Sequence, residues 1–170
     1  MNMLFDFTVN KDTNSIHITR EFAADQDLVW DAFTKPEILK QWYAPKPFRL
    51  QTKEMDFRVG GRWLYTMIST DTEPPTRYSL AEYIEIDPKN SFTSRNSFSD
   101  ENGNPIDGVF TSSITTTSFK GEPGKTTVNI VKKMASLAQL EQFAASGFIE
   151  GTAVGYRNLD EYLLTLGTQK

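Results

Sequence analysis

The chain has 170 residues, no cysteine and one histidine, His17. The lack of cysteine excludes disulfides, thiol nucleophiles and thiolate metal sites, and a single histidine excludes metal sites that need two or three imidazoles. The formal net charge of −4 argues against binding to nucleic acid or to an anionic membrane surface. We therefore expect no metal and no other cofactor, and an ordinary hydrolase or metalloenzyme is disfavoured.

A length of 170 residues is typical of one domain, and no linker, repeat or low-complexity tract divides the chain. No stretch approaches the roughly 20 consecutive apolar residues of a membrane span. Residues 1–10 lack the basic segment and the apolar run of a secretory signal. We therefore expect a single domain, 1–170, that is cytoplasmic and does not insert into a membrane.

Two segments of alternating polarity begin the chain. Apolar and polar side chains alternate over residues 4–9 and again over 15–22, and residues 10–14 between them favour a turn. This pattern predicts a β-hairpin. His17 falls on the polar face of the second strand, so we expect it to be exposed rather than catalytic. Arg20 falls on the apolar face, where it either pairs with a carboxylate or binds an anionic group.

Two short helices are predicted next. Asp25 is a suitable N-cap for the first helix. Thr34 and Glu37 form a capping-box pattern for the second helix, which has Pro36 in its first turn. The apolar sides of the two helices comprise Leu28, Val29, Ala32, Phe33, Ile38, Leu39 and Trp42.

Strand-like segments separated by turn-forming residues occupy the middle of the chain, a rhythm typical of an antiparallel meander. These segments are 48–57, 62–69, 78–86, 91–98, 109–119 and 126–134. The apolar period then becomes helical. Ser136 and Gln139 predict the capped start of a short helix, which Gly147 ends. A long helix continues to about Leu166, and only this helix is large enough to cover the apolar face of a curved sheet.

Several short motifs, in their order and spacing, resemble a known family. They are ITREF at 18–22, VWDAF at 29–33, Pro36 with Glu37, Trp42, GGRW at 60–63, YIEIDP at 83–88 and the ending from Gly151 to Leu163. Together they resemble the START-like SRPBCC superfamily, and more narrowly homologues of the C-terminal domain of the heat shock protein 90 ATPase activator. The resemblance implies an α+β helix-grip fold, similar to that of START domains and the birch pollen allergen. In this fold a curved antiparallel sheet wraps around a long C-terminal helix, and two short helices follow the first hairpin.

The resemblance also implies that a small hydrophobic molecule binds in a cavity between the sheet and the C-terminal helix. Aromatic side chains are suited to the walls of such a cavity, although each of them can instead fill the core. Tyr156 stands where the family often has tryptophan, and it would bring a hydroxyl group to the cavity. The candidate pocket residues are Trp30, Phe33, Trp42, Trp63, Tyr65, Tyr83, Phe110, Phe148 and Tyr156.

The carboxylate of Glu85 is a weaker candidate for a functional group in this cavity than the aromatic side chains. By alternation Glu85 shares a strand face with Tyr83, where it would orient a ligand hydroxyl or act as a base with a raised pKa. The alternative is that Glu85 is exposed or hydrogen-bonded. Arg20 is a candidate partner for Glu85, although the sequence alone does not bring the two together.

Glycines and lysines near the end of the chain complete the candidates. Gly147, Gly151 and Gly155 are spaced four residues apart, which indicates either a close approach of the helix to the sheet or room for a ligand. Lys132 and Lys133 are interpreted as solvated surface.

Two other functions stay open. The family name suggests a chaperone partner, so the chain would be a co-chaperone that stimulates heat shock protein 90 ATPase. The eukaryotic activator also has a separate N-terminal domain, for which 170 residues leave no room. Some relatives of the fold are cyclases or aromatases, so an enzyme acting on a hydrophobic substrate is the third possibility. Its catalytic candidates are Glu85 and Tyr156.

Overall fold

The computed structural model describes residues 4–45, 48–68, 78–106 and 112–167. The strands within these ranges are β1 Phe5–Asn10, β2 Ser15–Phe22, β3 Arg49–Met55, β4 Arg62–Ile68, β5 Tyr78–Asp87, β6 Ser91–Ser99, β7 Ser113–Glu122 and β8 Lys125–Met134. The helices are α1 Gln26–Thr34, α2 Pro36–Trp42, α3 Leu137–Ala144 and α4 Phe148–Gly167.

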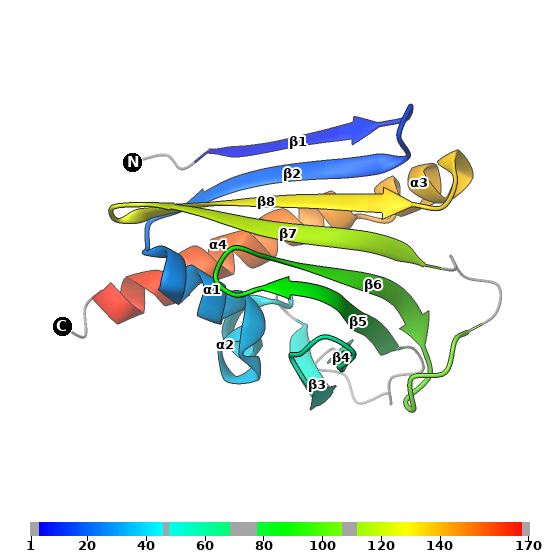
Figure 1. Cartoon of the computed structure of the whole chain (residues 1–170), viewed down its shortest axis with the longest axis horizontal. Coiled ribbons are helices and arrows are strands. Elements are labelled where there is room, and N and C mark those ends of the chain that lie inside the picture. The colour runs from blue at the N-terminus through cyan, green and yellow to red at the C-terminus, as the bar shows by residue number, and fades with distance from the viewer. Residues whose placement is uncertain (1–3, 46–47, 69–77, 107–111, 168–170) are drawn as a thin grey trace.

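These strands form one antiparallel sheet in the order β1-β2-β8-β7-β6-β5-β4-β3. Strands β3 to β8 make the predicted meander, in which each strand pairs with the next. The N-terminal hairpin joins the meander where β2 pairs with β8. Helix α4 runs along one face of the sheet, and α1 and α2 lie together near one end of it (Figure 1). The arrangement confirms the α+β class and the helix-grip fold.

Strand β2 shows why the sheet takes this form. Ile16, Ile18 and Phe22 are buried on its inner face, as their alternation predicts. His17 is exposed on the outer face, where its Nε2 lies 2.9 Å from Ser15 Oγ. The prediction that His17 is a surface residue is therefore confirmed.

The starts of the first two helices differ from the prediction. Asp25 occupies the N-cap position of α1, but its carboxylate accepts a 3.2 Å hydrogen bond from the Gly124 amide in the β7–β8 turn instead of capping the helix. The N-cap of α2 is Lys35 and not Thr34. Thr34 is the last residue of α1, and its hydroxyl donates a 2.9 Å hydrogen bond to the Trp30 carbonyl.

The last two helices follow the prediction more closely. Ser136 Oγ accepts a 3.2 Å hydrogen bond from the Gln139 amide, so the predicted cap of α3 is confirmed. Gly147 has a φ of 89°, a left-handed conformation that glycine adopts without strain, and α4 begins at the next residue. No helix among the described residues is both long and apolar enough to span a membrane.

Aromatic side chains from three helices and the sheet pack together beneath α1 and α2. The ring centroid of Phe33 lies 4.9 Å from that of Trp42, 5.4 Å from Phe119 and 6.2 Å from Tyr156. Trp42 Nε1 also donates a 2.9 Å hydrogen bond to the Ala32 carbonyl, which holds α2 against α1. These contacts fill the space between sheet and helix at this end of the fold.

Candidate functional site

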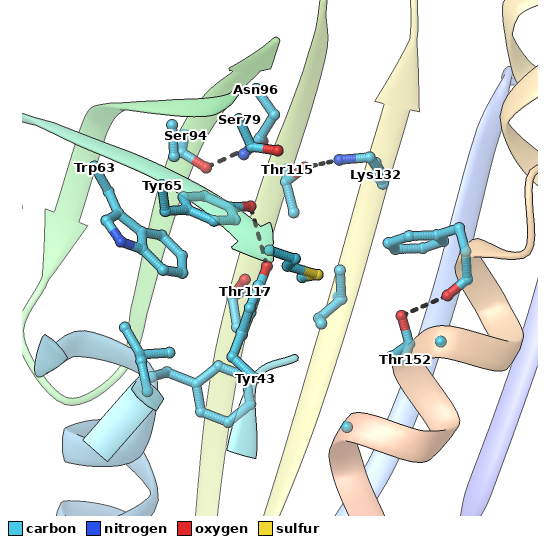
Figure 2. A pocket seen from close by; sticks show the side chains of 18 of the residues that line it. Tyr43, Trp63, Tyr65, Ser79, Ser94, Asn96, Thr115, Thr117, Lys132 and Thr152 are labelled. Carbon is cyan, nitrogen blue, oxygen red and sulfur yellow. Dashed lines mark hydrogen bonds between the residues drawn. The ribbon is translucent and has the colours of Figure 1, made fainter. Parts of the chain in front are cut away.

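A cavity of about 410 Å³ lies between the concave face of the sheet and α4 (Figure 2). It extends from the aromatic cluster at Phe33 and Trp42 to the junction of α3 and α4 at Ser146 and Gly147. Its walls come from β4 to β8 on the sheet side and from α1, α2, α3 and α4 on the other. Ser146, Gly147 and Met67 are exposed, so the cavity opens to solvent on that side.

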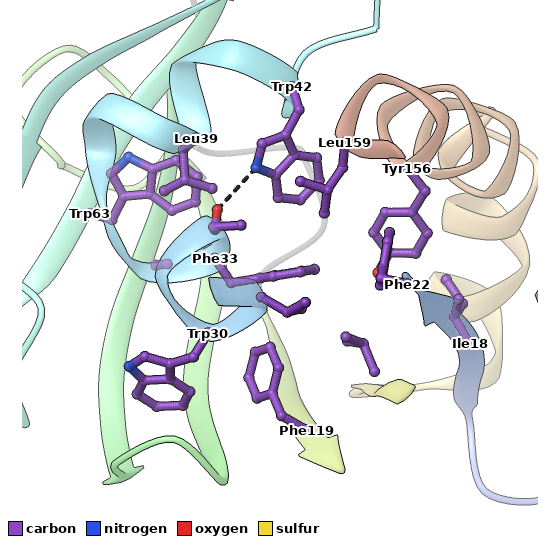
Figure 3. Close-up of a cluster of buried hydrophobic side chains, with 14 of the residues drawn as sticks. Ile18, Phe22, Trp30, Phe33, Leu39, Trp42, Trp63, Phe119, Tyr156 and Leu159 are labelled. Atoms are coloured by element: carbon purple, nitrogen blue, oxygen red, sulfur yellow. Dashed lines mark hydrogen bonds between the residues drawn. The ribbon is translucent and has the colours of Figure 1, made fainter. Parts of the chain in front are cut away.

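Most of the predicted pocket residues lie in the wall of this cavity. Trp30 does not, because its ring packs in the core against Phe57, Phe92 and Phe119, with centroids 5.2–5.9 Å apart. Figure 3 shows Trp30 beside Phe119 in this cluster. Phe110 lies outside the described residues. The predicted residues that line the cavity are Phe33, Trp42, Trp63, Tyr65, Tyr83, Phe148 and Tyr156.

Three aromatic residues form the wall beside β4. The rings of Trp63 and Tyr65 stack with centroids 3.8 Å apart, and the ring of Tyr43 meets both of them edge-on. The hydroxyl oxygens of Tyr43 and Tyr65 are 3.4 Å apart. Burial raises the pKa of Tyr43, and it raises the pKa of Tyr65 well above the ordinary value. Both phenols are therefore uncharged hydrogen-bonding groups at neutral pH.

A row of directly paired residues crosses the concave face of the sheet. Tyr83 on β5 pairs with Ser94 on β6, which pairs in turn with Thr115 on β7. Thr115 then pairs with Lys132 on β8. All four residues line the cavity, and Lys132 Nζ donates a 3.1 Å hydrogen bond to Thr115 Oγ1 (Figure 2). This row thus brings three hydroxyl-bearing residues and one ammonium group to the cavity wall.

The interpretation of Lys132 as solvated surface is wrong, whereas Lys133 is exposed as predicted. Lys132 is only 7% exposed, and the rings of Phe143 and Phe148 lie 5.1 and 5.6 Å from its Nζ. Burial lowers the pKa of Lys132 to about 8, so the amine is mostly protonated at pH 7. Alternation along β8 from the buried Val128 would have placed Lys132 on the inner face, and this signal was present in the sequence.

Lys132 is the only charged side chain among the described residues that line the cavity. None of the ion pairs in the described ranges includes it. Within the same ranges, no three His, Asp or Glu side chains gather closely enough to hold a metal ion. The ammonium group therefore faces the cavity without a carboxylate partner from this part of the chain.

Glu85 lies outside the cavity, so the prediction that it shares the face of Tyr83 is wrong. The pairing of β5 with β6 shifts between these two residues, and Ile84 is the extra residue of a β-bulge. Glu85 consequently pairs with Thr93 on the outer face and is exposed. The cyclase-like alternative thereby loses its candidate base.

Arg20 lies on the inner face of β2, as alternation predicted, but its partner is Asp160 on α4 and not Glu85. Its guanidinium group donates two hydrogen bonds to the Asp160 carboxylate, one of them 3.1 Å long. The Arg20 side chain is 8% exposed, and its guanidinium carbon lies 4.7 Å from the centroid of the Phe22 ring. This pair fastens β2 to α4, which favours the structural role of Arg20 over an anion site.

Tyr156 brings a hydroxyl group from α4, as expected from its place in the sequence. Its ring packs against Phe22 and Trp42, with centroids 5.1 and 6.1 Å apart. The hydroxyl oxygen is buried and has no hydrogen-bond partner among the described residues. Burial raises the pKa of this phenol, so it stays neutral at pH 7.

The glycines of α4 divide between the two alternatives. A Cβ at Gly155 would lie 3.3 Å from the Tyr43 carbonyl oxygen, so α4 closely approaches the end of α2 rather than the sheet. Gly151 lines the cavity, and a Cβ there would meet no atom within 4 Å. Gly155 thus permits a close contact, and Gly151 leaves room in the cavity.

The chain is similar to several solved structures. Protein Ms6760 from Mycobacterium smegmatis is 28% identical, with a TM-score of 0.84 over 95% of this chain and 97% of that chain. A protein from Staphylococcus epidermidis is 25% identical, with a TM-score of 0.78 over 93% of this chain and 94% of that chain. DynU16, from the dynemicin biosynthetic locus, is 18% identical, with a TM-score of 0.61 over 86% of this chain and 47% of that chain, and this likeness shows the fold alone.

Sequence comparison identifies the family. No curated protein matches the chain. The family model described as Activator of Hsp90 ATPase homolog 1-like protein matches residues 23–164. This stretch contains α1, α2, the meander and most of α4, and it includes all of the motifs found in the sequence except ITREF at 18–22. The chain belongs to the family of activator of Hsp90 ATPase homolog 1-like proteins.

Proposed function

We propose that this protein binds a small hydrophobic molecule in the cavity between the sheet and α4. The observation that carries the proposal is the cavity itself, whose volume of about 410 Å³ falls within the range of roughly 300–1,000 Å³ typical of small-molecule sites. Its walls are mainly aromatic and aliphatic side chains. A hydrophobic ligand would remove these walls from water, and the apolar area that it buries would contribute the binding free energy.

A few polar groups at fixed positions support the same proposal. Ser94, Thr115 and Lys132 on the sheet side of the cavity carry two hydroxyl groups and one ammonium group. Small-molecule sites combine apolar walls with such groups, because the polar contacts fix the orientation of the ligand. The ligand is therefore expected to carry polar atoms on an apolar body.

Titration with the neutral fluorescent probe N-phenyl-1-naphthylamine tests the proposal. We expect its emission to rise and to saturate at one probe per chain. Gly151→Leu places a side chain in open space at the cavity wall, so this variant should bind the probe roughly tenfold more weakly or worse. Arg157→Leu adds the same side chain at an exposed position of α4 and serves as the matched control.

Two results would contradict the proposal: no rise in emission with the wild-type protein, or equal affinity in the wild type and Gly151→Leu. Native mass spectrometry of the protein purified under mild conditions gives an independent measurement. A bound small molecule would add mass to the native ion and would leave the chain on denaturation.

The family name supports a second candidate function, stimulation of the ATPase of heat shock protein 90. An ATPase assay with the chaperone from the same organism tests it directly. Absence of stimulation at a saturating concentration of this protein would exclude it. Gly151→Leu separates the two functions, because a surface contact with a chaperone does not require the cavity.

A further inference from the structure

We propose that the ligand of this cavity is a hydrophobic carboxylic acid, and that Lys132 binds its carboxylate. The inference rests on the proposed function, because it names the chemical class of the molecule that the cavity takes. The ligand is thus an anion with a ring-containing apolar body, and not a neutral lipid.

The charge balance of the cavity is the first argument. Lys132 is 7% exposed, and no Asp or Glu is found among the described residues that line the cavity. A buried ammonium group is costly unless an anion pairs with it. The described part of the chain supplies no carboxylate within 4 Å of this group. A ligand carboxylate would provide the missing charge.

The hydrogen-bonding capacity of the site is the second argument. An ammonium group has three donors, and Thr115 Oγ1 accepts only one of them. The described residues therefore leave two donors of Lys132 for an incoming group. The hydroxyl of Thr115 is able to donate its own hydrogen to the same group. A carboxylate, with two acceptor oxygens, matches this set of donors better than a single neutral oxygen does.

The rings around Lys132 support an apolar body attached to the acid. Phe143 on α3 and Phe148 on α4 both face the ammonium group, at 5.1 and 5.6 Å, and hold it by cation–π attraction. The stacked rings of Trp63 and Tyr65 line the same cavity. Aromatic walls favour flat ligands, because rings gain from edge and face contacts as well as from burial.

Other ionisable groups near the site do not compensate the charge of Lys132. Burial raises the pKa of each cavity tyrosine, so all of them are neutral at pH 7. Glu141 on α3 and Glu150 on α4 are exposed, and Glu141 Oε1 lies 3.8 Å from Lys11 Nζ. Strand β2 places Ile16 beside Lys132. The cavity tyrosines are Tyr43, Tyr65, Tyr83 and Tyr156.

Calorimetric titration with 2-naphthylacetate and 2-naphthylacetamide tests the inference, because the two compounds share one ring body and differ in charge. At pH 7 the wild-type protein should bind the acid about 10- to 100-fold more tightly than the amide. Lys132→Met should lose this preference and keep its affinity for the amide. Lys133→Met removes the same charge from the outer face, so it should keep the wild-type preference.

The outcomes separate the two proposals. Three results would overturn the assignment of Lys132 while hydrophobic binding stands. The wild type binds acid and amide equally, Lys132→Met keeps the preference for the acid, or Lys133→Met loses it. No binding of either compound, together with no binding of N-phenyl-1-naphthylamine, would overturn both. If Lys132→Met does not fold, the wild type at pH 10 replaces it: the preference should then fall towards one, and an unchanged preference refutes the inference.

Discussion

Replacing Lys132 with methionine is expected to stabilise the ligand-free protein at pH 7. The pKa of Lys132 is about 8 in the folded protein, against an ordinary value of 10.5. Since one pKa unit corresponds to about 1.4 kcal/mol, burial of the charged amine lowers the free energy of unfolding by about 3 kcal/mol. Loss of the hydrogen bond to Thr115 offsets about 1 kcal/mol of this. The expected net gain is therefore about 2 kcal/mol.

The gain should depend on pH in a defined direction. Between pH 8 and pH 10.5 the amine is protonated in the unfolded chain and increasingly neutral in the folded one. The unfolded state then binds more protons, so the stability of the wild-type protein rises with pH through this window. The advantage of Lys132→Met is therefore full below pH 8 and disappears by about pH 10.5.

Urea unfolding, monitored by tryptophan fluorescence, measures the free energy of unfolding of the two proteins. The signal reports unfolding because Trp30, Trp42 and Trp63 are all buried in the folded protein. The two proteins are compared at pH 7 and at pH 10.5, so that the titration of other groups cancels. Lys133→Met is the control, since it removes an exposed amine and should change the stability by less than about 0.5 kcal/mol. A variant that is less stable than the wild type at pH 7, or a gain that is the same at both pH values, would refute the reasoning.

Three further predictions concern α4. Tyr156→Phe removes a buried hydroxyl without a described partner, so thermal unfolding should show a gain of about 1 kcal/mol; a loss would mean that the hydroxyl is bonded. Asp160→Ala leaves the buried Arg20 guanidinium unpaired and should lower the free energy of urea unfolding by about 3 kcal/mol, whereas an unchanged value would make the pair dispensable. Gly151→Ala should stabilise α4 by about 1 kcal/mol in the same assay, and Gly155→Ala should gain less because of the Tyr43 carbonyl.

Alternation of side chains carried much of the fold prediction. The hairpin, the meander and the long helix each have a regular apolar period, which reports the face that the core covers. The same period placed Arg20 on the inner face of β2, where the structure has it. Its partner Asp160 is 140 residues away in the sequence, and no local pattern relates the two.

Predictions about single sites were wrong where a local irregularity or a tertiary contact intervened. The bulge at Ile84 reverses the alternation of β5, so Glu85 lies on the opposite face from the predicted one. The composition of this strand does not indicate an extra residue. Asp25 bonds to a distant turn instead of its own helix. Lys132 differs for another reason: its charge favours the surface, but its position in the alternation of β8 places it on the inner face.

The pairing of β2 with β8 has a consequence for how the chain folds. Ile18 lies directly opposite Ile130 in the sheet, yet more than a hundred residues separate them in the sequence. A contact of this range closes a long loop, and folds dominated by such contacts fold slowly. During synthesis the side chains of Ile16 and Phe22 on the N-terminal hairpin therefore stay exposed to water until β8 and α4 have left the ribosome.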